Sequence, residues 1–231
     1  MIEIIPSEAN QIWQRAADLL FEKINKENGK GKKIFLLLSG GSALSIYQEL
    51  ANKIQNIEIR PGNVAIGQLD ERFRPDSETD INSLAIEKTG LIEILKNKEV
   101  PFYKIPQTGT FREAAFNYDK LLTKLFLSFD YKMAVLGIGK DGHIAGLLRS
   151  YKNEWDKDRM VVGYENRGEY KWRISITPGV FRILDYGIVA VSGVEKKEMA
   201  ARILENESED VNNLPGILIH KIKEVDLLKD F

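Results

Sequence analysis

Short apolar runs alternate with longer stretches of helical periodicity along this chain of 231 residues. Residues Ile34–Leu38, Met133–Leu136 and Ile188–Val191 are apolar without alternation, which is typical of strands covered on both faces. Val64–Ile66 is a shorter run of the same kind, whereas Arg173–Thr177 alternates as a half-exposed strand does. These runs predict the strands of the fold.

Helical spacing fills most of the intervals between the runs. Apolar residues recur every four positions from Ile12 to Ile24, which predicts a helix with Ser7 as its N-cap and an end near Gly29. Further helices are expected up to Ile54 and over residues 83–96, 114–129 and 195–204, with one more strand at 217–219. Strands separated by helices of this length predict an α/β fold, a mostly parallel sheet with helices on both faces.

The chain shows no internal repeat, low-complexity tract or Pro/Gly-rich linker, so we expect a single domain over residues 1–231. Residues 150–171 are the least periodic part and predict an irregular excursion. In a parallel sheet, ligands bind beyond the carboxyl ends of the strands. The loops that follow Leu38, Leu69, Leu136 and Val191 are therefore where we expect the chemistry.

The amino-acid composition limits which reactions and binding sites are possible. The chain has no cysteine, which excludes disulfides, thiolate nucleophiles and Cys-ligated metal sites, and it has only two histidines, His143 and His220. Its formal net charge is −1, which predicts no strong attraction for nucleic acid or anionic membranes. The first residues lack a basic segment and an apolar run of signal-peptide length, so a cytoplasmic protein is expected.

Two of the four loops carry groups suited to an anion. Ser39, Gly40, Gly41 and Ser42 form a glycine turn between a strand and a helix, where free backbone N–H groups and hydroxyls could hold a phosphate. The alternative is a tight turn with an N-cap serine.

The loop after Leu69 places Asp70, Glu71 and Arg72 at the exit of a strand. Arg72 could offer a planar fork to a carboxylate or phosphate, while the two acids could accept sugar hydroxyls or hold the arginines in place. The alternative is a solvated charge run.

A third loop contains Gly137, Gly139 and Gly142, which satisfy the G-x-G-x-x-G pattern of dinucleotide sites. The irregular stretch that follows at 150–171 does not supply the helix and strand which that fingerprint requires. His143 can take a proton from water at neutral pH, and Asp141 could orient the imidazole or the water.

The fourth loop region has Arg173 at the start of its strand and Lys196 at the entry to a helix. If the sheet brings both towards the glycine turn, they complete a dianion site. His220 lies outside these loops, and we interpret it as structural or exposed.

Five motifs in register resemble the 6-phosphogluconolactonase and glucosamine-6-phosphate deaminase superfamily. They are Leu38-Ser39-Gly40-Gly41-Ser42, Asp70-Glu71-Arg72 with Pro75 and Asn82, Gly137-x-Gly139-x-Asp141-Gly142-His143-x-Ala145, Arg173-x-Ser175-x-Thr177, and Gly193-x-x-Lys196. The resemblance implies a Rossmann-like fold that binds a six-carbon sugar phosphate, with no metal or nucleotide cofactor.

Within this superfamily, the deaminases typically carry Asp-Glu-Tyr where this chain has Asp70-Glu71-Arg72, and a Glu-Pro pair where it has Leu148-Arg149. The chain is therefore more similar to the lactonase branch. It departs from the lactonase pattern at Ala43-Leu44, which replace Thr-Pro, at Leu148-Arg149, which replace Phe-Pro, and at Arg74.

These observations predict a hydrolase that converts 6-phosphogluconolactone to 6-phosphogluconate in the pentose phosphate pathway. We expect His143 as the general base towards water, Asp141 as its partner and Arg72 beside the developing negative charge. Gly40, Gly41, Ser42, Arg173 and Lys196 would hold the phosphate. The alternatives are an amino-sugar phosphate isomerase or deaminase, and a sugar-phosphate sensor without catalysis.

Overall fold

The computed structural model describes residues 1–55, 59, 62–77, 79–149, 151–155 and 157–231. Within these residues, seven strands form one sheet in the order β1-β10-β9-β6-β2-β3-β5, and all neighbouring strands are parallel. The predicted fold class is confirmed. The strands are β1 (Ile2–Pro6), β2 (Ile34–Leu38), β3 (Val64–Gln68), β5 (Phe102–Tyr103), β6 (Tyr131–Leu136), β9 (Tyr186–Val191) and β10 (Glu224–Lys229).

A small antiparallel sheet lies beyond the carboxyl end of β3. It has the order β4-β8-β7, with β4 at Asp70–Arg72, β7 at Val161–Glu165 and β8 at Trp172–Ile176. Leu69 joins the two sheets, because its N–H donates to Leu38 O at 2.9 Å while its carbonyl accepts from Ile176 N at 2.9 Å. The small sheet is thereby fixed beside the end of β2.

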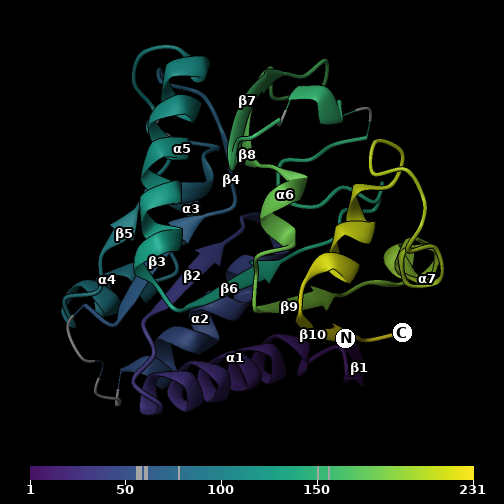
Figure 1. Cartoon of the computed structure of the whole chain (residues 1–231). Coiled ribbons are helices and arrows are strands. Elements are labelled where there is room, and N and C mark those ends of the chain that lie inside the picture. Colours follow the sequence, from purple (N-terminus) through teal and green to yellow (C-terminus); the bar gives the residue numbers. More distant parts are fainter. Residues whose placement is uncertain (56–58, 60–61, 78, 150, 156) are drawn as a thin grey trace.

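Helices cover both faces of the large sheet (Figure 1). One face packs against α1 (Ile12–Gly29), α2 (Leu44–Ile54), α3 (Asn82–Glu87) and α4 (Leu91–Lys96). The other packs against α5 (Phe111–Ser128), α6 (Pro178–Phe181), α7 (Lys197–Glu205) and the small sheet. Burial of apolar surface on both faces explains why the strand runs lack alternation. None of the helices among the described residues is long and apolar enough to cross a membrane.

The chain changes direction across the sheet between β2 and β6. From β2 it continues to β3 on one side, whereas from β6 it continues to β9 on the other. Such a topological switch point leaves a crevice outside the carboxyl ends of the two central strands. The loops after β2 and β6 border this crevice.

Two helix predictions needed correction. The prediction of Ser7 as an N-cap was wrong, because α1 begins at Ile12 with Gln11 before it, and the N–H of Ser7 donates to Lys229 O at 2.9 Å beside β1. The helix expected over 83–96 is two helices, since Gly90 adopts a left-handed φ of 82° between them.

Three further segments differ from the sequence expectation. Residues 217–219 belong to a short 3₁₀ helix, Pro215–Lys221, and not to a strand. There the N–H of Gly216 donates to Gly142 O at 2.8 Å, so the segment packs on a cavity loop instead of joining the sheet. The acidic stretch after Leu69 is strand β4, and the excursion at 150–171, of which residues 150 and 156 lie outside the described residues, contains β7.

Candidate active site

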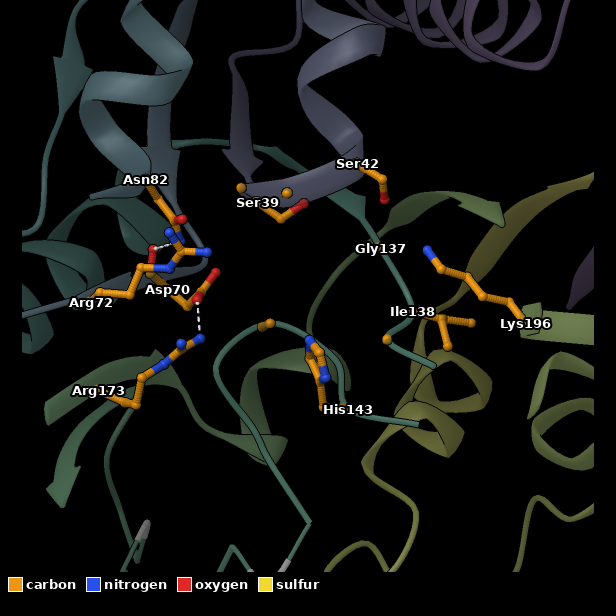
Figure 2. A pocket seen from close by; sticks show the side chains of 14 residues that line it. Ser39, Ser42, Asp70, Arg72, Asn82, Gly137, Ile138, His143, Arg173 and Lys196 are labelled. Atoms are coloured by element: carbon orange, nitrogen blue, oxygen red, sulfur yellow. Dashed lines mark hydrogen bonds and ion pairs between the residues drawn. The ribbon is translucent and has the colours of Figure 1, made fainter. Parts of the chain in front are cut away.

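A cavity of about 300 Å³ lies at the switch point, and all four predicted loops reach it (Figure 2). Figure 2 shows Arg72, Arg173 and Asp70 on one side and Lys196 on the opposite side, with His143 between them. The described residues that line it are Ser39, Gly40, Gly41, Ser42, Asp70, Arg72, Asn82, Gly137, Ile138, Gly139, His143, Ala145, Arg173 and Lys196. Nine of the eleven site residues predicted from the sequence therefore border one cavity, and Glu71 and Asp141 do not.

The glycine turn after β2 is held open towards the cavity. Gly41 has a φ of 67°, which favours glycine, and a side chain at Gly40 would lie 2.2 Å from Asn82 Oδ1. The hydroxyl of Tyr47 donates to Ser39 O at 2.8 Å and fixes the start of the turn. The Ser39 hydroxyl is buried without a partner among the described residues. The turn leads through a short 3₁₀ helix, Gly41–Ala43, into α2, and its four residues line the cavity, where backbone N–H groups suit an anion.

Two arginines face each other across the small sheet. Arg72 in β4 is directly paired with Arg173 in β8. Arg173 is only 8% exposed and forms an ion pair with Asp70, with 3.0 Å between Nη2 and Oδ2. Arg72 donates from Nη1 to Asp80 O at 3.3 Å. The Nε atoms of both arginines are buried and lack partners among the described residues.

Glu71 points away from the cavity and is fully buried. Its carboxylate accepts hydrogen bonds from the backbone N–H groups of Arg72, Asn82 and Ser83 at 2.8, 2.5 and 2.8 Å, and from Gln68 Nε2 at 2.9 Å. Burial raises the pKa of this carboxyl, and the four donors oppose that shift. Glu71 therefore fixes the loop that carries Asn82 to the cavity.

The histidine loop after β6 holds an imidazole against a carboxylate. His143 Nδ1 lies 2.5 Å from Asp141 Oδ1. This hydrogen bond from His143 lowers the pKa of Asp141 to about 2, so the carboxyl is ionised at neutral pH. His143 lines the cavity and Asp141 does not, so Asp141 can influence a ligand only through its hydrogen bond with the imidazole.

Backbone geometry sets this pair in place. A side chain on Gly139 would lie 2.1 Å from His143 Nδ1 and 2.6 Å from Asp141 Oδ1, and Gly142 has a φ of 85°. The loop folds back on itself, because Gly139 N donates to His143 O at 3.0 Å and Gly142 N to Gly139 O at 2.9 Å. No helix begins at Gly142, which removes the structural basis of the dinucleotide interpretation.

Lys196 ends a short 3₁₀ helix, Val194–Lys196, that follows β9. The preceding residues are tied to the segment after β10. The hydroxyl of Ser192 donates to Asp230 Oδ2 at 2.5 Å, and Gly193 N donates to Asp230 Oδ1 at 3.0 Å. Asp230 is a residue that the sequence reasoning missed, and it fixes the loop from which Lys196 reaches the cavity.

Asn82, Gly137, Ile138, Gly139 and Ala145 also line the cavity and were not among the predicted site residues. All except Ile138 are named residues of the motifs that carried the resemblance, so membership of a motif could have identified them as site residues. The second histidine lies elsewhere: Nε2 of His220 is 2.8 Å from Ile203 O, a contact that fits the structural interpretation.

Charge in the cavity favours an anionic ligand. Among its described lining residues, Arg72, Arg173 and Lys196 are cationic and Asp70 is the only carboxylate. Hydrogen bonds between arginine and phosphate or carboxylate are strong and geometrically specific. The fold and site together define an α/β protein with a cavity at a switch point whose charge suits a small anion, and with a histidine–carboxylate pair beside it.

The family follows from a sequence comparison. The model of the family described as glucosamine-6-phosphate isomerases/6-phosphogluconolactonase matches residues 7–227. The chain belongs to this family, and the predicted resemblance is confirmed.

Relatives carry both names of the family. A 6-phosphogluconolactonase of Chlamydia muridarum is 27% identical over 78% of this chain and 69% of its own length. A glucosamine-6-phosphate deaminase of Colwellia psychrerythraea is 24% identical over 94% of this chain and 84% of its own. The crystal structure of a Thermotoga maritima 6-phosphogluconolactonase superimposes with a TM-score of 0.77 over 99% of both chains at 22% identity, which supports the fold.

Proposed function

We propose that this protein is an enzyme that hydrolyses 6-phosphogluconolactone to 6-phosphogluconate, a step of the pentose phosphate pathway. The observation that carries the proposal is that the His143–Asp141 pair, the glycine turn and three cationic side chains meet at one cavity. Several relatives in the family are named 6-phosphogluconolactonase, including those of Chlamydia muridarum and Thermotoga maritima.

The phosphate of the substrate would bind at the glycine turn. Backbone N–H groups of Gly40 and Gly41 and the Ser42 hydroxyl supply donors, while Arg173 and Lys196 supply positive charge. Binding at this remote group positions the lactone for reaction, so part of its binding energy is expressed in turnover.

His143 would act as the general base. Since the ionised Asp141 accepts the proton on Nδ1, the other ring nitrogen, Nε2, is left with a lone pair for a proton from water. As this proton moves to Nε2, the water oxygen forms a bond to the lactone carbonyl carbon. The carbonyl oxygen then carries negative charge, which the guanidinium of Arg72 stabilises.

The ester opens in the second half of the reaction. The tetrahedral carbon expels the ring oxygen, which takes the proton from the His143 imidazolium and becomes a hydroxyl. The products are a carboxylic acid, which ionises at neutral pH, and a histidine restored to its neutral form. No cofactor is consumed in this sequence.

Deamination of an amino-sugar phosphate is the second candidate, because one matched relative has that name. Two positions favour the lactonase: Arg72 stands where family deaminases typically carry tyrosine, and Leu148-Arg149 stand in place of their Glu-Pro pair. Release of ammonium from glucosamine 6-phosphate by the pure protein would support deamination instead. Binding without turnover would support a sensor.

The deciding experiment follows acid release from 6-phosphogluconolactone with the wild type, His143→Ala and His220→Ala. We expect the His143 variant to lose about 10² to 10⁴-fold in turnover, the usual contribution of a general base. His220→Ala controls for the loss of an imidazole, because that ring contacts Ile203 O away from the cavity. Equal activity of the His143 variant and wild type would contradict the assignment of the base.

A further inference from the structure

The arginine pair of the cavity carries an excess of charge. Arg72 and Arg173 are direct partners in the antiparallel register of β4 and β8, and like charges in that relation repel each other. Asp70 pairs with Arg173. Among the described residues, Arg72 has no carboxylate partner and donates to the carbonyl of Asp80. One hydrogen bond to a neutral acceptor therefore orients the Arg72 guanidinium, so other contacts of this group matter for its position.

Tyr170 lies against this pair. Its ring centroid is 4.4 Å from Arg72 Cζ and 5.9 Å from Arg173 Cζ, both within the range of a cation–π contact. Tyr170 is half-buried and belongs to the short connection between β7 and β8. It also lines a second hollow of about 530 Å³ together with Arg74 and Trp172.

We propose that Tyr170 is a positioning residue that holds the guanidinium of Arg72 for the reaction, an inference that rests on the proposed function. A carboxylate at this place would also hold the arginine, but it would cancel the charge that the developing oxyanion requires. The electron-rich face of a ring attracts a cation without neutralising it. A cation–π contact does not occupy the N–H donors of a guanidinium, so donors of Arg72 beyond the one bonded to Asp80 O remain for the substrate.

This assignment also gives the excursion at residues 150–171 a function. Its described part forms β7 and leads back into β8, and Tyr170 stands two residues before β8 begins, with its ring centroid 4.4 Å from Arg72 Cζ. Arg173 comes from the same hairpin three residues later. The hairpin therefore supplies both an arginine of the cavity and the ring that contacts the two arginines.

The test compares Tyr170→Phe, Tyr170→Leu, Arg72→Lys and the double variant Tyr170→Leu/Arg72→Lys in lactone hydrolysis. We expect Tyr170→Phe to keep wild-type kcat/KM, because the ring remains. Tyr170→Leu should lower kcat/KM by about tenfold, the size of a partly desolvated cation–π contact. In the double variant the leucine should add little to the loss caused by Arg72→Lys, because Tyr170 acts through Arg72.

Phe116→Leu is the matched control. Lys120 Nζ lies 4.2 Å from the ring centroid of Phe116 on the exposed side of α5, so this variant removes a cation–π contact away from the cavity and should keep full activity. Thermal unfolding of each variant checks that it folds. Wild-type activity of Tyr170→Leu, or losses that multiply in the double variant, would overturn the proposal.

A wild type that does not hydrolyse the lactone would refute the proposed function and not, by itself, the role of Tyr170. Titration calorimetry with 6-phosphogluconate on the same variants then decides. Weaker binding by Tyr170→Leu, restored in Tyr170→Phe, supports the positioning role. Equal binding by all the variants of Tyr170 contradicts it.

Discussion

At the amino ends of the parallel strands, charged side chains satisfy one another, whereas at the carboxyl ends cations outnumber carboxylates around a cavity. Glu27 accepts from both Lys30 and Lys32 at 2.7 Å, and Asp226 accepts from the Tyr186 hydroxyl at 2.6 Å. At the other end, Asp70 is the single lining carboxylate beside three cations. The first arrangement pairs its charges within the chain, whereas the second has an excess of positive charge that suits an anionic ligand.

The difference shows which charges serve stability and which serve binding. Ion pairs with an exposed partner contribute little stability each, so the exposed lysines Lys30 and Lys32 can be replaced singly at small cost. Like charges assembled around a cavity repel one another, so their presence there points to a role in binding rather than in stability. Substitutions matched between the two ends can therefore separate these roles.

The largest effect is expected from Gly139→Ala. A methyl group there would overlap His143 Nδ1 and displace the imidazole, and misplacing a catalytic group by about 1 Å can cost 10²-fold or more in kcat/KM. Gly187→Ala, near the amino end of β9, is the counterpart, since the one close contact of its methyl group is the flexible end of Ile222 at 2.9 Å, and Leu136 lies at an ordinary 3.5 Å. It should lose stability and keep activity in the same lactone assay. Equal activity of both variants would contradict the assigned geometry.

Arg173→Ala should follow in size. It removes a proposed phosphate ligand and leaves Asp70 buried without its partner, so we expect kcat/KM to fall by about 30-fold or more, with effects on both kcat and KM. Lys30→Ala at the amino end breaks the ion pair with Glu27 and should leave the kinetics unchanged. Steady-state kinetics of both variants makes the comparison, and a change in KM alone would argue against a positioning effect of the phosphate.

Asp230→Ala should have a smaller effect. Loss of its hydrogen bonds to Ser192 and Gly193 loosens the loop of Lys196, and we expect KM to rise about fivefold, the size of a lost hydrogen bond. Asp185→Ala removes a similar bond, from Lys132 N at 2.9 Å, at the amino end of the same sheet. It should lower the melting temperature without a change in KM. A shift in KM with both variants would indicate a general loss of structure.

The smallest effect concerns stability in acid. The pKa of Asp141 is lowered to about 2 from an ordinary 3.8, so its stabilisation is present above pH 3.8 and is lost as the pH falls towards 2. The side chain is 47% exposed, and solvent screening limits the effect to less than about 1 kcal/mol. Melting temperature should fall less steeply with acidification in Asp141→Asn and His143→Ala than in the wild type. His220→Ala should keep the wild-type slope.

Much of the fold was predictable because buried strands of a parallel sheet are continuous apolar runs. The central strands β2, β6 and β9 followed from that pattern, and the glycine and histidine loops were expected at their ends. Polar strands were harder to predict. The short strand β4 has the sequence Asp-Glu-Arg, which is also typical of an exposed loop, and only its pairing with β8 makes it a strand.

The remaining site residues depend on contacts between segments far apart in the sequence. Asp230 acts on a loop 37 residues earlier, and Tyr170 contacts Arg72 of the distant strand β4. Glu71 is an example of a residue that the sequence pattern placed wrongly at the surface of the site. Its neighbours in sequence are charged, yet its carboxylate is buried and accepts four hydrogen bonds. The local pattern of apolar and polar residues does not predict strand register or contacts between distant segments.

Leu69 has a mechanical consequence for the whole molecule. This one buried residue ties its N–H to β2 and its carbonyl to β8, so a sliding motion of one sheet against the other must break at least one of these two bonds. The arginines and the glycine turn are therefore expected to move as one rigid unit. The amide of Leu69 should exchange with deuterium only in the slowest openings of the protein, close to the rate of global unfolding.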